Sequence, residues 1–161
     1  EVCSELFAMP EREFQYVAME YMLKAKKSWD SRIPVLIDRW VDEKTWWDVV
    51  DVLAPKVMSD YFMLFPEQRD TWVARWMKSP IFWHQRLCIL FQLNYKKKTD
   101  FELLKSECEK HKHSNEFFIQ KAIGWSLRDY GRFNPNAVKS YVENTNLKPL
   151  SKKEALRNIL K

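Results

Sequence analysis

The chain has 161 residues, of which 46% are hydrophobic and 15% aromatic, so it carries enough apolar material for the core of one domain. Its only two glycines, Gly124 and Gly131, exclude the glycine-rich loops that bind nucleotide phosphates. The net charge of +5 and the isoelectric point near 9.1 favour a polyanionic partner.

The cysteines and histidines argue against metal chemistry. Cys3, Cys88 and Cys108 are widely spaced and form no Cys-x-x-Cys pair, a pattern that predicts reduced thiols in a cytoplasmic protein. His111 and His113 are close together, but their lysine-flanked stretch is typical of a solvated loop. No apolar run approaches the roughly 20 residues of a membrane span. We therefore expect no metal, no cofactor and no membrane partner.

Helix signals run along the whole chain, whereas strand signals are nearly absent. Prolines stand where the first turn of a helix tolerates them: Pro10, Pro66, Pro80 and Pro135. Two Ser/Thr-x-x-Glu sequences match capping boxes: Thr99 with Glu102, and Ser151 with Glu154. These signals predict a single all-α domain with helices over 10–28, 32–42, 45–53, 55–65, 66–78, 80–97, 100–112, 115–132, 135–145 and 151–160. The first residues match neither an initiator methionine nor a signal peptide, so we expect the chain to begin partway into a longer protein.

Paired aromatic residues recur at a nearly constant spacing. The pairs Trp46-Trp47, Phe82-Trp83 and Phe117-Phe118 begin at positions 46, 82 and 117, so the steps are 36 and 35 residues. A period of this size is typical of stacked helical-hairpin repeats, in which equivalent positions line one surface. A charged residue follows each pair about one turn later: Asp51, Arg86 and Lys121. The alternative is that the aromatics fill the core and the charges are merely solvated.

The helix after Thr45 presents two faces. Its expected core stripe follows helical spacing: Trp46, Val49, Val50 and Leu53. Trp47 and Asp51 are four residues apart and lie together beside that stripe. Pro55 interrupts the pattern, which places Asp51 near a helix C-terminus, where the helix dipole disfavours an acid. Asp51 either serves a function or pairs with Arg86 of the next repeat.

The helix after Ser114 carries a second candidate surface. Its buried stripe is expected to contain Ile119, Ile123, Leu127 and Tyr130. On the other side Lys121, Trp125 and Arg128 follow helical spacing, with Phe118 adjacent. An indole between two cations suits a surface that contacts phosphates and bases. Packing against a following helix is the alternative.

Three segments, WWDVVD at 46–51, WHQRLCILFQL at 83–93 and EFFIQKAIGWSLR at 116–128, resemble the AlkD-like DNA alkylation repair family. These are alkylpurine DNA glycosylases built from HEAT-like repeats, and the resemblance extends over essentially the whole chain. It implies a curved α-solenoid that wraps duplex DNA in its concave face. It assigns the catalytic carboxylate to Asp51, lesion contacts to Trp47 and Trp125, and a contact with the DNA backbone to Arg86. Family members carry further N-terminal helices that this chain is expected to lack.

The chemistry of alkylated purines suits these residue types. A purine alkylated at N3 or N7 is cationic and departs as a neutral base, so the enzyme needs a carboxylate for the oxocarbenium-like sugar and no general acid. The leading hypothesis is a monomeric cytoplasmic glycosylase acting on alkylated duplex DNA. In it Asp51, Arg86, Trp47 and Trp125 converge on one concave surface, with Phe118, Lys121 and Arg128 as further DNA contacts. The alternatives are a non-catalytic protein that binds duplex or branched DNA and a protein-interaction scaffold.

Overall fold

The computed structural model describes residues 1–157 and 159, and this part of the chain is built from helices without any strand. The all-α fold predicted from the sequence is therefore confirmed. The helices gather into two compact units, Glu1–Leu87 and Cys88–Lys161, and each unit is described by itself. No helix in the described residues combines the length and the hydropathy needed to cross a membrane.

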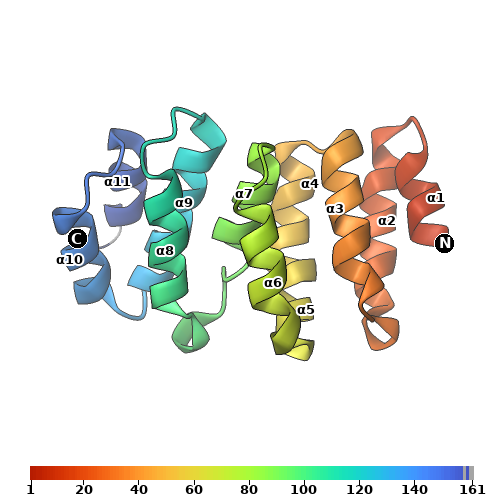
Figure 1. Ribbon diagram of the computed structural model, residues 1–161, viewed down its shortest axis with the longest axis horizontal. Helices are drawn as coiled ribbons and strands as arrows, with labels where there is room; N and C mark the ends of the chain where they lie inside the picture. The colour runs from red at the N-terminus through yellow and green to blue at the C-terminus, as the bar shows by residue number, and fades with distance from the viewer. Residues whose placement is uncertain (158, 160–161) are drawn as a thin grey trace. The chain divides into compact units, whose positions relative to one another are not determined.

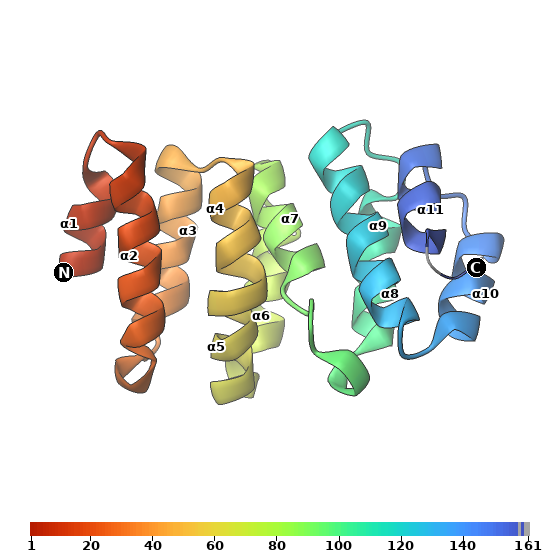
Figure 2. The same cartoon turned by 180° about the vertical axis from the view of Figure 1, so that it is seen from behind.

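The first unit contains two layers of helices. α2 and the run from α4 to α5 lie side by side in one layer, and α3 and α6 lie in the other (Figures 1 and 2). The elements are α1 (Val2–Ala8), α2 (Arg12–Lys24), η1 (Lys26–Ser28), α3 (Arg32–Lys44), α4 (Trp47–Val52), η2 (Leu53–Met58), α5 (Ser59–Leu64), α6 (Pro66–Trp76) and the start of α7 (Phe82–Leu90). The layers enclose a core of large side chains that includes Met19, Met22, Ile37, Trp40, Tyr61 and Trp76.

The second unit repeats this arrangement. α9 packs against α11 in one layer, and α8 and α10 lie in the other (Figures 1 and 2). The elements after α7 are η3 (Lys96–Lys98), α8 (Phe101–His111), α9 (Phe117–Gly131), α10 (Pro135–Asn144) and α11 (Pro149–Leu156). The predicted stripe of α9 is buried at Ile119, Ile123 and Leu127, which confirms the helical spacing at these positions. Tyr130, the fourth residue of the predicted stripe, is only half-buried near the end of the helix.

Tertiary hydrogen bonds connect residues that are about one repeat length apart in the sequence. Several side-chain bonds join residues 35 to 37 positions apart, close to the predicted steps of 36 and 35. They connect Arg12 with Asp48, Arg75 with Asp38, Arg86 with Asp51, and Ser126 with Ile89. Because neighbouring hairpins present equivalent positions to each other, a bond between them spans one repeat length. The chain therefore has an all-α helical-repeat fold.

The helical run that carries Asp51 continues past Pro55. The sequence analysis placed a helix end there, which is wrong: α4 passes into η2, a π-helical segment, and η2 passes into α5. Proline cannot donate a backbone hydrogen bond, and its ring crowds the carbonyl four residues earlier in an α-helix. A wider π-turn relieves that crowding without ending the helix. Asp51 therefore lies inside a long helical run rather than near its C-terminus.

Both predicted capping boxes are also wrong. Asp100, rather than Thr99, caps α8 by accepting a hydrogen bond of 3.0 Å from the backbone N–H of Leu103. α11 begins at Pro149, so Ser151 lies within the helix and donates to the carbonyl of Gln120. The helix predicted over 151–160 ends at residue 156, and residues 158 and 160–161 lie outside the described residues.

The helix predicted over 80–97 is shorter in the structure, because α7 ends at Leu90. Asn94 and Lys96 follow with φ angles of 71° and 58°. A helix cannot continue through these left-handed residues. The short α1 at the start of the chain was not predicted.

Candidate functional site

Asp51 and Arg86 form the centre of the candidate site in the first unit. Asp51 Oδ1 accepts hydrogen bonds from Arg86 Nε at 3.0 Å and from Nη2 at 2.7 Å. α4 supplies the carboxylate from its second turn, and α7 supplies the guanidinium from its second turn. This is the pairing between successive repeats that the sequence analysis kept as an alternative.

The two partners differ in their exposure to solvent. The Arg86 side chain is 1% exposed, whereas that of Asp51 is 22% exposed. Burial raises the pKa of Asp51 above its ordinary value, and the nearby charge of Arg86 opposes this effect. Arg86 is buried, which departs from the exposed position expected of a contact for the DNA backbone. Its role toward DNA stays a prediction, and its hydrogen bonds hold Asp51 in place.

The remaining oxygen of Asp51 is available. The two hydrogen bonds that Asp51 accepts from Arg86 go to Oδ1, and no residue that the structure describes donates to Oδ2. The carboxylate is thus held by one oxygen and can present the other to a ligand. An acid that is oriented and only partly solvated is suited to stabilising a nearby positive charge.

Trp47 lies four residues before Asp51 on the same helix, and its side chain is exposed. Its relative exposure is 44%, and it makes no hydrogen bond or ring contact with any residue of the described ranges. Trp46 was expected in the core stripe, which is wrong, because it precedes α4 in an extended conformation and is 49% exposed. Trp46 instead packs edge-on against Trp83, with ring centroids 5.9 Å apart. Trp47 is therefore the aromatic of this pair that is open to a ligand.

The predicted cations of the second unit share one carboxylate. Lys121 Nζ lies 2.9 Å from Glu154 Oε1, and Arg128 Nη1 lies 2.7 Å from Glu154 Oε2. The hydrogen bond from Lys121 is the main cause that lowers the pKa of Glu154, and Arg128 adds to it. This role of Glu154 is not evident from the sequence, where Ser151 and Glu154 match a capping box. α11 is thus the following helix against which this face of α9 packs.

Trp125 is half-buried. The ammonium of Lys121 lies over its ring, 5.2 Å from the centroid. Together with Arg128 and Arg132, Trp125 lines a shallow cavity of about 230 Å³ within the second unit. At the start of the same helix, Phe118 packs edge-on against Phe117, with ring centroids 5.3 Å apart.

The structure thus brings the predicted residues together in two groups. Asp51, Arg86 and Trp47 belong to the first unit, whereas the group around Trp125 belongs to the second. Their convergence on one concave surface stays a prediction.

A further group beside Asp51 was missed by the sequence analysis. The carboxylate of Asp48 accepts hydrogen bonds from Arg12 and from the hydroxyl of Tyr16, both on α2. The only signal in the sequence was the separation of 36 residues between Arg12 and Asp48, which equals one repeat. Charged residues one period apart are therefore candidates for contacts between neighbouring helices.

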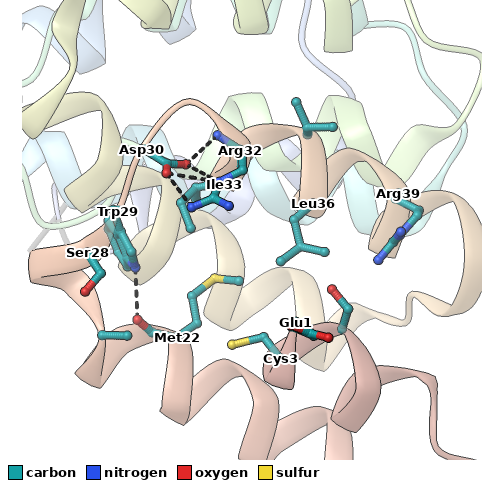
Figure 3. Close-up of a pocket in the computed structure, with 13 residues that line it drawn as sticks. Glu1, Cys3, Met22, Ser28, Trp29, Asp30, Arg32, Ile33, Leu36 and Arg39 are labelled. Atoms are coloured by element: carbon teal, nitrogen blue, oxygen red, sulfur yellow. Dashed lines mark hydrogen bonds and ion pairs between the residues drawn. The ribbon is translucent and has the colours of Figure 1, made fainter.

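A larger cavity lies elsewhere in the first unit. It measures about 370 Å³ and opens between α1, α2 and α3, with Met22, Trp29 and Leu36 among its apolar lining (Figure 3). The indole N–H of Trp29 donates to the carbonyl of Met22, 2.9 Å away, which fixes one wall. None of the site residues predicted from the sequence lines this cavity.

Comparisons with known proteins agree on one family. The family model described as "DNA alkylation repair enzyme" matches residues 1–159. A solved structure described as "Predicted DNA alkylation repair enzyme from Enterococcus faecalis" has a TM-score of 0.91 and 33% sequence identity, and the match covers 99% of this chain and 74% of that one. No curated protein matches the chain. The family match and the identity over nearly all of the sequence lead to one conclusion: the chain belongs to the DNA alkylation repair enzyme family.

Proposed function

We propose that this chain is a DNA glycosylase that hydrolyses the N-glycosidic bond of cationic N3- and N7-alkylated purines in duplex DNA. Family membership supports a role in the repair of alkylated DNA, with DNA as the partner. One observation carries the finer proposal. Asp51 is held through Oδ1 by a buried arginine and keeps Oδ2 unengaged, beside an exposed indole.

The chemistry follows from the charge of the lesion. Alkylation makes the base cationic, so the base takes the electron pair of the C1′–N bond and leaves as a neutral molecule. Positive charge develops on the deoxyribose, and water attacks C1′ and releases one proton. A carboxylate such as Asp51 stabilises the sugar cation, orients the water and accepts this proton. No general acid is needed, because the leaving base requires no proton.

Arg86 acts through Asp51 in this mechanism. Its guanidinium fixes the carboxylate and opposes the rise in pKa that burial causes, which favours the ionised form of Asp51. A protonated acid would lose its attraction for the sugar cation. Arg86 is therefore a positioning residue rather than a contact for phosphate.

The indoles provide selectivity for a cationic base. Trp47 is exposed and Trp125 is half-buried with the ammonium of Lys121 already over its ring, and a cation over an indole face is stabilised by about 0.5–2 kcal/mol. Because cation–π contacts reward positive charge, they favour an alkylated purine over an undamaged one. Phe118 adds an aromatic surface at the start of α9. We further propose that the lesion is processed without burying a fully flipped base, unlike in most glycosylases.

Lys121 and Arg128 supply positive charge for the DNA backbone. Each binds Glu154 through one nitrogen and keeps further N–H donors for phosphate oxygens. Glu154 then holds the side chains of Lys121 and Arg128 in fixed orientations. This arrangement suits a pre-organised contact with DNA.

Release of bases from methylated DNA tests the proposal. Duplex DNA treated with a methylating agent is incubated with the protein, and free purines are quantified. We expect release of N3-methyladenine and N7-methylguanine and almost none of uracil from a matched uracil-containing duplex. Efficient uracil excision would contradict the mechanism, because neutral uracil takes the bonding electron pair and leaves as an anion, which needs a proton or hydrogen-bond donor that the mechanism does not include. Duplex binding without release of any base would favour a non-catalytic DNA-binding protein instead.

A further inference from the structure

Arg12, Tyr16 and Asp48 form a compact polar cluster between α2 and α4. Arg12 Nη2 and the hydroxyl of Tyr16 donate to the two carboxylate oxygens of Asp48. Arg12 Nε also donates to the Tyr16 hydroxyl at 3.2 Å. Three side chains thus hold one another in a closed set of hydrogen bonds, and the guanidinium of Arg12 has a fixed orientation.

Part of the Arg12 guanidinium is left open by this cluster. Nε and Nη2 are engaged, but no residue in the described ranges accepts a hydrogen bond from Nη1. The Arg12 side chain is 47% exposed, whereas the Asp48 side chain is 16% exposed. The cluster therefore presents a cation to solvent and keeps its acid largely covered.

The cluster lies close to the candidate catalytic carboxylate. Asp48 precedes Asp51 by three residues on α4, and residues at this spacing are neighbours on one side of a helix. The negative charge of Asp48 also acts on Asp51 and contributes to raising the pKa of the Asp51 carboxyl. Arg12 is thus an exposed cation bound to a carboxylate that lies one helical turn from the proposed reaction centre.

The acid of the cluster stays ionised near neutral pH. Burial alone raises the pKa of Asp48, but the hydrogen bonds from Tyr16 and Arg12 outweigh it and lower that pKa below its ordinary value. The ion pair therefore persists under the conditions of DNA binding. An arginine held in this way loses little side-chain freedom when it meets a second acceptor.

We propose that Arg12 is a phosphodiester contact for the DNA strand at this site, pre-positioned by Asp48 and Tyr16. Nη1 donates to a phosphate oxygen, while Nη2 and Nε keep their bonds within the cluster. The inference rests on the proposed function only for its premise that duplex DNA docks on the side of α4 that carries Asp51. It assigns to Arg12 the backbone contact that the buried Arg86 does not make.

Binding to an undamaged duplex tests this contact apart from catalysis. Affinity is measured by fluorescence anisotropy at several salt concentrations for the wild type, R12Q and R12K. Arg32 provides a matched control, because its guanidinium is also paired with an aspartate, Asp30, but belongs to α3. R32Q removes the same charge from the same unit. Thermal melting of each variant checks that the fold is retained.

We expect R12Q to weaken binding about tenfold near 0.1 M salt and to lower the slope of log affinity against log salt by about 0.9. R32Q should leave the slope within error of the wild type. R12K keeps the positive charge but loses the several N–H donors of the guanidinium. It should therefore keep the salt slope of the wild type and lose part of the affinity. Equal effects of R12Q and R32Q would overturn the contact, since only overall charge would then matter.

The outcomes also separate this inference from the proposed glycosylase. If the wild type releases no base but R12Q lowers affinity and slope, the contact stands and the catalytic proposal fails. If the wild type releases alkylated purines but R12Q binds DNA as R32Q does, the catalytic proposal stands and the contact at Arg12 is refuted.

Discussion

Arg86 and Asp51 are 35 residues apart in the sequence, and Nε and Nη2 of the arginine donate to the same carboxylate oxygen. The buried side chain is the cation, whereas the acid remains partly exposed. A pair that served stability alone would have no need to leave one carboxylate oxygen open. The arrangement is instead suited to presenting an ionised acid at the surface.

Replacing Arg86 by glutamine should lower stability without removing a phosphate contact. The change leaves the partly buried carboxylate of Asp51 without its partner, which should lower the free energy of unfolding by about 3 kcal/mol. This value is near the lower end for broken buried ion pairs, because the Asp51 side chain remains partly exposed to solvent. The salt dependence of duplex binding should stay at the wild-type slope. Denaturant unfolding and binding titrations measure the two effects. If stability were unchanged and the slope of log affinity against log salt fell by about one, Arg86 would instead be shown to contact a DNA phosphate.

The pH dependence of base release should report on Asp51. The mechanism needs the ionised acid, so release should fall as the pH drops through the pKa of Asp51, which burial raises above its ordinary 3.8. Removing Arg86 should shift this acid limb to higher pH, because the opposing charge is lost. Single-turnover rates measured with wild type and R86Q test both statements. A flat profile down to pH 4 would argue against a catalytic carboxylate.

Loss of activity at low pH must be distinguished from acid unfolding. The direction of the pKa shift of Asp51 separates the two. A carboxyl whose pKa is raised in the folded protein stabilises the fold while protonated, and this contribution is lost as the pH rises through the folded pKa. Asp51 therefore does not drive acid unfolding. Circular dichroism at each pH should show folded protein across the acid limb of the rate.

Trp47 should matter for the lesion and hardly at all for the fold. Its ring is 44% exposed and makes no hydrogen bond or ring contact with described residues, so W47A should change the free energy of unfolding by no more than about 1 kcal/mol. Loss of a cation–π contact should slow base release about 2- to 30-fold. W46A is the matched control, because Trp46 packs against Trp83 and should affect stability more than rate. Equal rates for W47A and wild type would remove Trp47 from the site.

Gly124 should be needed for the approach of α11 to α9. A Cβ at this position would lie 2.4 Å from Glu154 Cβ and 3.0 Å from the carbonyl oxygen of Ser151, so α11 would have to move. G124A should therefore destabilise the protein by about 1–3 kcal/mol, although alanine favours helices. G131A is a milder control, because the close contact of its Cβ, at 2.6 Å, is with the end of the flexible Ile159 side chain rather than with backbone. Equal melting temperatures for the two variants would contradict this account.

The sequence was sufficient to predict the fold class and the repeat, because both depend on spacing. The aromatic pairs mark the starts of α4, α7 and α9, and helical periodicity identified the buried stripe of α9. Trp46 was misplaced because periodicity does not reveal where a helix begins. The extended backbone at Trp46 turns its side chain out of the stripe.

The partners of the charged residues were harder to predict. Lys121 and Arg128 were recognised as cations on one face, but Glu154 was assigned to a helix cap because a local motif explained it equally well. The contact of Arg12 with Asp48 depends on how α2 packs beside α4, and short-range patterns contain no such information. The burial of Arg86 likewise depends on the packing of neighbouring helices, which local patterns do not record.

The most direct test of the catalytic proposal is base release by D51N compared with its binding to DNA. Asparagine keeps the shape of the side chain and removes the charge, so stabilisation of the sugar cation should be lost at a cost of about 3–4 kcal/mol, or roughly 10²- to 10³-fold in rate. Duplex affinity should stay equal or rise, because a negative charge facing the DNA is removed. Single-turnover release of N7-methylguanine and anisotropy binding to the same duplex give both quantities. We predict a rate lower by at least about 100-fold with undiminished affinity. A D51N variant that releases the base at the wild-type rate would contradict the assignment of Asp51 as the catalytic carboxylate.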